Sequence, residues 1–147
     1  MYRHILIPID GSPAADKAIA AGIELARSRK AKVTLFTAVP EYQPPGEAEP
    51  MARRAIAFWD HERISRDNAQ AILRPAAERL RAAGVECATA YAECNRPHEA
   101  IIDAARARCC DLILMSSRGR SGLSELWYGS ETHAVLEHSS IPTLVYR

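Results

Sequence analysis

Short apolar runs that alternate with longer helical patterns are the feature that most constrains this chain of 147 residues. Apolar runs of strand length lie at residues 3–9, 32–39, 85–92, 111–116 and 141–146. Helical spacing covers residues 13–29, 51–83, 97–107 and the stretch from 130 to 138. Because helices of ten or more residues separate successive strands, we expect right-handed crossovers and a parallel sheet with helices on both faces. The pattern predicts an α/β, three-layer, Rossmann-like fold.

Proline and glycine mark the boundaries of these elements. Pro13 suits the first turn of the helix at 13–29, and Gly84 should end the helix at 51–83. Pro75 should kink or divide that helix, because proline lacks an N–H group. Residues 41–50 are rich in proline and acidic side chains, which predicts a mobile loop, either a lid or a plain surface loop. The length favours one domain spanning residues 1–147.

Composition excludes several classes of partner. The net charge is +1, with 19 basic and 18 acidic residues spread along the chain, so nothing favours nucleic acid or a membrane surface. No apolar run approaches the ~20 residues that cross a bilayer, and the first residues do not resemble a signal peptide. The four cysteines lack the spacing of a zinc site or a redox pair, which predicts reduced thiols. We therefore expect a cytoplasmic protein with no bound structural metal.

The stretch from Met115 to Ser130, MSSRGRSGLSELWYGS, packs three glycines and two arginines between a predicted strand and a predicted helix. Ser130 is the expected N-cap of that helix. Amide N–H groups at Gly129, Ser130 and Glu131 would then face whatever the loop encloses, at the positive end of the helix dipole. Such a site favours an anion, phosphate above all.

A second turn, from Pro8 to Pro13, follows the first predicted strand. If that strand lies beside the fourth, both turns line one crevice at the carboxyl ends of the strands. Asp10 accepts hydrogen bonds only, which suits a ribose or an adenine amino group better than a phosphate. Alternatively, Asp10 or Ser12 forms an Asx turn or an N-cap without any ligand. Both interpretations remain open from the residues alone.

These residues resemble the universal stress protein family of the adenine-nucleotide-binding kind, over essentially the whole chain. The opening IPIDGS at 7–12 and the close IPTLV at 141–145 carry the resemblance, together with the glycine loop. In that family the loop reads glycine, two residues, glycine, nine residues, then glycine and serine or threonine. Gly119, Gly129 and Ser130 match it, and Ser116 stands at the first position. The resemblance implies a five-stranded parallel sheet in the order 3-2-1-4-5, of the adenine nucleotide alpha hydrolase-like type.

The resemblance also implies which residues surround the adenosine part of a nucleotide. Asp10 would contact the adenosine, and Val39 would meet the adenine through its backbone. Met115 and Ser116 would flank the ribose, and Pro8 belongs to the same predicted site.

The phosphates would lie against the glycine loop. The resemblance assigns them to Gly119, Gly129 and Ser130, and Ser130 can also donate its hydroxyl to an oxyanion. Arg118 and Arg120 either add positive charge to this site or remain solvated.

Two residues depart from the family pattern. Ser116 replaces a glycine, and its Cβ can obstruct the close approach of a ribose or phosphate. Glu131 places a carboxylate in the first helical turn, where the family usually has an apolar residue. That carboxylate stabilises the helix end by roughly 0.3–1 kcal/mol but repels a triphosphate, unless it points outward or shares a magnesium ion.

The leading expectation is a cytoplasmic stress-response protein that binds ATP, with or without Mg²⁺, while ADP and AMP stay open. No Ser-His-Asp arrangement or Walker lysine is present, so slow hydrolysis with Asp10 as base is the most chemistry expected. The alternatives are a nucleotide-free interaction module of the same fold and a weak nucleotide hydrolase. The apolar run at 141–146 is an expected edge strand, and the resemblance implies a homodimer through it. A regulatory protein partner of unknown identity completes this hypothesis.

Overall fold

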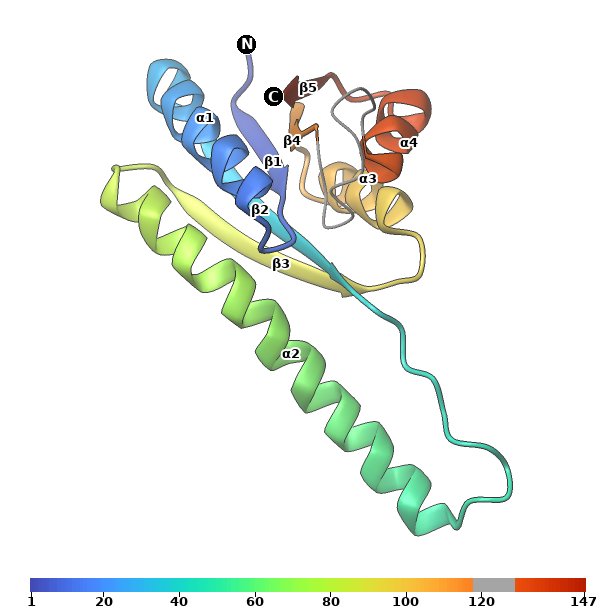
Figure 1. The fold of residues 1–147 in the computed structure, drawn as a ribbon. Helices are drawn as coiled ribbons and strands as arrows, with labels where there is room; N and C mark the ends of the chain where they lie inside the picture. Colours follow the sequence, from blue (N-terminus) through green and yellow to red (C-terminus); the bar gives the residue numbers. More distant parts are fainter. Residues whose placement is uncertain (118–128) are drawn as a thin grey trace.

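The computed structural model describes residues 1–117 and 129–147. Its strands are β1 (His4–Pro8), β2 (Lys32–Val39), β3 (Cys87–Glu93), β4 (Leu112–Ser116) and β5 (Thr143–Tyr146). Its helices are α1 (Pro13–Arg29), α2 (Met51–Ala82), α3 (Pro97–Ala107) and α4 (Ser130–His138). All strand pairs are parallel, and the order across the sheet is β3-β2-β1-β4-β5 (Figure 1). The predicted fold class and strand order are confirmed.

Two hydrophobic clusters fill the space on either side of the sheet. On one face, Ile5 and Ile7 of β1 pack with the apolar sides of α1 and α2. On the other face, Leu6 packs with α3 and α4 through Ile101 and Val135. Because both faces of β1 are covered, its side chains from Ile5 to Pro8 are apolar in an unbroken run rather than in alternation.

The helix α1 lies very close to β1 at Gly22. A Cβ atom at this position would overlap the Cδ1 atom of Ile7 and come within 3.3 Å of Leu114. The missing side chain therefore lets the backbone of α1 approach the sheet, which holds the helix start near the end of β1.

The helix α2 runs without interruption from Met51 to Ala82, with Pro75 inside it. Of the two outcomes predicted for Pro75, a kink or a division, the structure excludes the division. Proline removes the hydrogen bond to the carbonyl four residues earlier, but both Ala71 and Pro75 are exposed, so water can satisfy that carbonyl. At 32 residues α2 is far longer than the sheet needs, and its first part projects beyond the sheet (Figure 1).

The amino ends of the strands are held by an internal polar cluster. The Asp111 carboxylate accepts the backbone N–H groups of Arg3 at 2.7 Å and His4 at 3.0 Å. The Nε2 atom of buried His4 lies 2.8 Å from Thr34 Oγ1. Burial, with Lys32 nearby, lowers the pKa of His4. Burial opposes ionisation of Asp111 as well, but the backbone N–H groups of Arg3, His4 and Asp111, together with the nearby His4, hold the pKa of Asp111 below its usual range.

The cysteines are free thiols, in line with the predicted reduced state. Cys109 is exposed, Cys110 is buried, and Cys87 and Cys94 are partly buried. Burial raises the pKa of the Cys110 thiol to about 11, which keeps it protonated near neutral pH. None of the described helices combines the length and the apolar character needed to cross a bilayer.

Candidate functional site

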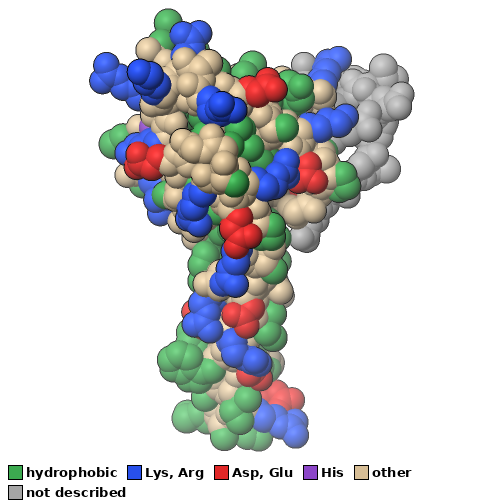
Figure 2. Space-filling model, turned by 90° about the vertical axis from the view of Figure 1, so that its left-hand side faces the viewer, with side chains coloured by type: hydrophobic (Ala, Val, Ile, Leu, Met, Phe, Trp, Pro, Cys, Tyr) green, Lys and Arg blue, Asp and Glu red, His purple; other side chains and the backbone are tan. Residues whose placement is uncertain are grey.

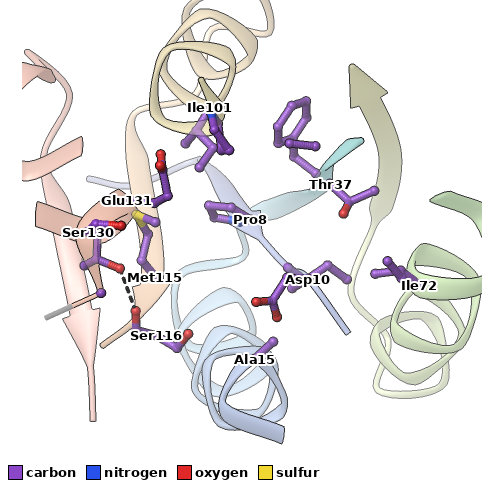
Figure 3. Close-up of a pocket in the computed structure, with 16 residues that line it drawn as sticks. Pro8, Asp10, Ala15, Thr37, Ile72, Ile101, Met115, Ser116, Ser130 and Glu131 are labelled. Carbon is purple, nitrogen blue, oxygen red and sulfur yellow. Dashed lines mark hydrogen bonds between the residues drawn. The ribbon is translucent and has the colours of Figure 1, made fainter. Parts of the chain in front are cut away.

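A pocket of about 370 Å³ opens at the carboxyl ends of β1, β2 and β4 (Figure 3). The first residues of α3 and α4 and one turn of α2 complete its walls. Its apolar lining includes Ile9, Phe36, Ile101 and Met115, and its size is that of a small-molecule site. This edge, at the point where the chain reverses its strand order, is where parallel sheets bind ligands.

The pocket brings together most of the residues predicted from the sequence. Those that line it are Pro8, Asp10, Met115, Ser116, Gly129 and Ser130. Arg118, Gly119 and Arg120 lie outside the described residues. Val39 is buried in the core and is absent from the lining, where Thr37 and Ala38 stand instead. The carbonyl of Val39 accepts the N–H of Cys94 at 2.9 Å, so this backbone acceptor is engaged within the protein.

The turn between β1 and α1 forms one wall of the pocket. Asp10 Oδ1 accepts the Ser12 N–H at 2.9 Å, and Ser12 Oγ accepts the Ala15 N–H at 3.4 Å as the N-cap of α1. Gly11 allows this tight turn with a φ of 79°. The Asx turn and the N-cap considered from the sequence are therefore both formed. A carboxylate accepts several hydrogen bonds, so this turn is compatible with a ligand at Asp10, whose carboxylate points into the pocket in Figure 3.

The start of α4 forms the opposite wall. Gly129 is the N-cap and Ser130 is the first helical residue, so the prediction of Ser130 as N-cap was wrong by one position. The N–H of Gly129 donates to the Ser117 carbonyl at 2.8 Å, which corrects the expectation that this amide faces a ligand. The Thr132 hydroxyl donates to the Ser116 carbonyl at 3.0 Å, the dashed line in Figure 3. Both bonds join the end of β4 to the start of α4, a closure that local sequence patterns do not encode.

The amides of Ser130 to Thr132 belong to the first turn of α4 and have no acceptor within the helix. Among the residues that the structure describes, no side chain caps this helix. These donors, together with the Ser130 hydroxyl, lie at the positive end of the helix dipole beside the pocket.

The Glu131 side chain is turned toward the neighbouring helix α3. Its carboxylate accepts the backbone N–H of His98 at 2.7 Å and lies 3.2 Å from His98 Nδ1. His98 belongs to the first turn of α3, whose N-cap Arg96 makes no side-chain capping bond, so Glu131 caps α3 from the neighbouring helix. In Figure 3 its side chain points away from Ser130. The two residues are 33 positions apart, and no local sequence signal connects them.

Three helix N-termini thus surround the pocket, and they differ in how their donors are satisfied. Ser12 caps α1 and Glu131 caps α3, whereas α4 receives no side-chain cap from the described part of the chain. Of the three, α4 offers its amide donors to a bound group. Anions bind well at such a helix start. Beside it, the apolar walls suit a flat apolar ring, and Asp10 supplies an acceptor for hydroxyl or amino groups.

Comparison with known proteins agrees with this architecture. The sequence model of the Universal stress protein family matches residues 1–147. The universal stress protein YxiE of Bacillus subtilis is 31% identical, over 100% of both chains. The solved structure of protein MJ0577 from Methanocaldococcus jannaschii has a TM-score of 0.80 at 24% identity, covering 99% of this chain and 95% of that one.

Two further solved structures hold ligands. A universal stress protein in complex with cAMP has a TM-score of 0.68 at 21% identity, covering 99% of this chain and 97% of that one. The universal stress protein from Archaeoglobus fulgidus in complex with dAMP has a TM-score of 0.66 at 19% identity, covering 99% of this chain and 98% of that one. At these identities the likeness shows a shared fold. The family match over the whole length carries the assignment: this chain belongs to the universal stress protein family.

Proposed function

We propose that this protein binds an adenine nucleotide at the pocket between β1 and α4, with ATP, with or without Mg²⁺, as the leading ligand and ADP and AMP as open alternatives. In this proposal it acts as a cytoplasmic, homodimeric stress-response protein whose nucleotide state is read by a regulatory protein. The observation that carries the proposal is the uncapped start of α4 beside an apolar pocket. Relatives of the same fold that hold cAMP and dAMP support an adenine nucleotide as the ligand class.

The residues present fit the chemistry of such a ligand. The base would lie against the apolar walls near Phe36 and Ile101, and the ribose hydroxyls would donate to Asp10. The phosphates would accept from the first-turn amides of α4 and from the Ser130 hydroxyl. Asp10 and Glu131 are the carboxylates of the described lining. Mg²⁺ usually keeps several waters and binds through phosphates with one or two carboxylates, so it would depend mainly on the nucleotide.

A second candidate is a nucleotide-free interaction module. The observation that favours it is the internal pairing of two backbone groups expected to meet the nucleotide, the Gly129 N–H and the Val39 carbonyl. If both stay engaged, the site has fewer contacts for an adenine and a phosphate than the family resemblance implies.

The proposed homodimer uses the edge of the sheet at β5. Within the described residues, β5 pairs with β4 on one side and has no strand on the other. Its outward side chains Leu144 and Tyr146 are about half exposed. An uncovered apolar edge strand favours pairing with another strand, and pairing of the 141–146 segments about a two-fold axis would cover it.

The test begins with denaturing freshly purified protein and identifying any released nucleotide by chromatography. The stripped protein is then titrated with ATP and Mg²⁺, with ADP and AMP in parallel, while free phosphate is followed over time. Ser130→Ala should weaken binding by about 1–3 kcal/mol, the range for a hydrogen bond to a charged group. Ser140→Ala, at an exposed serine beyond α4, is the matched control and should leave affinity unchanged.

Each outcome separates the candidates. Bound adenine nucleotide, with weakened binding in Ser130→Ala alone, would support the proposal. Protein that releases no nucleotide and does not bind ATP at millimolar concentration would rule out nucleotide binding and favour the interaction module. Steady release of phosphate would add slow hydrolysis to the binding function.

A further inference from the structure

The first part of α2 stands away from the rest of the molecule. The buried positions of this helix begin at Ser65 and continue to Leu80. Before Ser65, the partly buried His61 still reaches β3, lying 3.4 Å from Glu93. Residues 51–60, which we call the projecting segment, extend past the end of the sheet (Figure 1). Within the described chain, Tyr42 is the ring that packs on this segment, 5.5 Å from Phe58.

One side of the projecting segment is apolar. Met51, Ala52, Ala55, Ile56 and Trp59 follow the spacing that places residues on one side of an α-helix, and we call them the apolar stripe. Met51 is 83% exposed, Ile56 61% and Trp59 69%. Figure 2 shows hydrophobic side chains gathered around the lower end of the projecting helix.

Such a stripe is unfavourable in water. A helical segment of about ten residues gains little from its own hydrogen bonds, and helices in proteins depend on packing of their apolar side. Large apolar side chains grouped on an exposed surface typically mark an interface. The projecting segment therefore needs a partner surface that the described part of this chain does not provide.

We propose that the apolar stripe packs against the same stripe of a second copy of this chain, antiparallel about a two-fold axis at Ala55. The stripe is self-complementary in this arrangement, because the small Ala55 meets Ala55 of the partner subunit and lets the helix axes approach closely. Met51 and Trp59 lie four residues on either side of Ala55. Met51 therefore packs on the partner's Trp59, a contact that the thioether favours.

The charges beside the stripe fit the same partner. Arg63 and Arg66 follow Trp59 at helical spacing, on the stripe's side of α2. At the opposite end of the stripe, Glu47 and Glu49 precede the helix, and Glu49 makes an exposed 3.5 Å ion pair with Arg53, so Glu47 is the carboxylate that a partner's arginine would meet first. An antiparallel second copy brings the acidic end of one stripe toward the basic end of the other. Arg63 is exposed, and its ion pair with Asp60 is long at 3.5 Å. The Arg63 guanidinium can therefore also pair with a carboxylate of the partner.

The area is also adequate for a weak, specific contact. The five side chains offer roughly 400–500 Å² on each copy, so the pair approaches the ~1,000 Å² of a biological interface. This contact is separate from the proposed pairing of β5 and does not depend on nucleotide binding.

The matched test uses two isoleucines of α2. Ile56 lies in the stripe, whereas Ile64, which is 50% exposed, lies nine residues from Ala55 and therefore on the opposite side of the helix. Ile56→Glu should weaken self-association at least tenfold in sedimentation equilibrium, and Trp59→Ala should act in the same direction. Ile64→Glu should behave as wild type. All are compared in the Leu144→Lys background, which adds charge at β5, so that the two contacts are measured separately.

A disulfide cross-linking experiment locates the two-fold axis. Ala55→Cys should give a disulfide-linked dimer on mild oxidation, while Ala57→Cys, nearly opposite on the helix, should give no more than wild type. Equal cross-linking of these two variants would overturn the proposal. An Ile56→Glu variant with the same self-association constant as wild type would also overturn it. The same holds if the protein with the wild-type stripe stays monomeric in the Leu144→Lys background and binds a different protein instead.

Discussion

The helices α1 and α4 begin at the same edge of the sheet, beside the same pocket, yet their N-termini are built in opposite ways. At α1, Ser12 caps the helix and Asp10 closes the turn before it. At α4, the N-cap is Gly129, and no side chain within residues 1–117 and 129–147 caps the first turn. A helix whose first-turn N–H groups are capped by nearby side chains adds to the stability of the fold. A helix whose first-turn N–H groups are uncapped can donate them to a ligand.

The helix α3 is an intermediate case. Its cap comes from Glu131, which is itself in the first turn of α4. One carboxylate thereby removes the donors of α3 from the pocket while adding negative charge near the donors of α4. The comparison of α1 with α4 therefore predicts separate effects of substitution on stability and on affinity.

The largest expected effect is on the free energy of unfolding, and it tests whether the packing of α1 stabilises the fold. Gly22→Val should lower the free energy of unfolding by about 1–3 kcal/mol, because its side chain would overlap Ile7 at the closest approach of α1 and β1. Denaturant unfolding followed by circular dichroism measures this. Gly46→Val, at a glycine with no atom within 4 Å of its added Cβ, is the control. Equal losses in both variants would contradict the close packing of α1.

The next effect tests the cap of α1 directly. Ser12→Ala should lower the free energy of unfolding by about 1 kcal/mol, since the Ala15 N–H loses its side-chain acceptor and keeps the Ser12 carbonyl at 3.1 Å alone. The same variant should bind nucleotide within a factor of about two of wild type, in contrast to Ser130→Ala. Unfolding curves and titrations on one preparation compare the two. A large loss of affinity in Ser12→Ala would show that both N-termini contact the ligand.

A smaller effect is expected on the affinity for ATP, from the negative charge of Glu131 in the first turn of α4. Glu131→Gln keeps an oxygen that can accept the His98 N–H but removes the negative charge, so binding of ATP should tighten by about 0.3–1 kcal/mol. Glu137→Gln, at an exposed glutamate of the same helix, should not change the affinity. Calorimetric titration distinguishes them. Weaker binding in Glu131→Gln would instead place the carboxylate among the groups that hold the nucleotide.

The smallest effect is on the pH dependence of stability, and it arises at the amino ends of the strands, away from the N-termini of α1 and α4. Because the pKa of His4 is lowered, the unfolded chain binds more protons than the folded one below pH ~6.5. The contribution of His4 to stability is complete above that pH and is lost as the pH falls through its lower, folded-state pKa. His4→Gln should therefore flatten the pH dependence of unfolding between about pH 5 and 7. His133→Gln, at an exposed histidine, should keep the wild-type slope, and a shared slope in all three proteins would refute this role.

Much of the fold was predictable because its signals are local. The apolar run at 32–39 and the helix at 13–29 match β2 and α1, and Ser12 and Pro13 mark the start of α1 in the sequence itself. Six of the predicted site residues line the pocket for the same reason, since the carboxyl ends of parallel strands share one edge. Pro75 was predicted to kink or divide α2, and it does not divide the helix, because the carbonyl that proline leaves unpaired lies at an exposed position.

The sequence by itself determined the α/β alternation, the strand order through the family resemblance, and the edge of the sheet that carries the pocket. Only the tertiary structure decided which backbone groups remain for a ligand. Val39 uses its carbonyl on Cys94, Gly129 uses its amide on Ser117, and Glu131 is engaged by His98. Each of these bonds joins residues from different elements, and buried or half-buried polar groups pair with whatever the fold brings within reach. Periodicity reports the direction of a side chain, but partners across elements follow from packing.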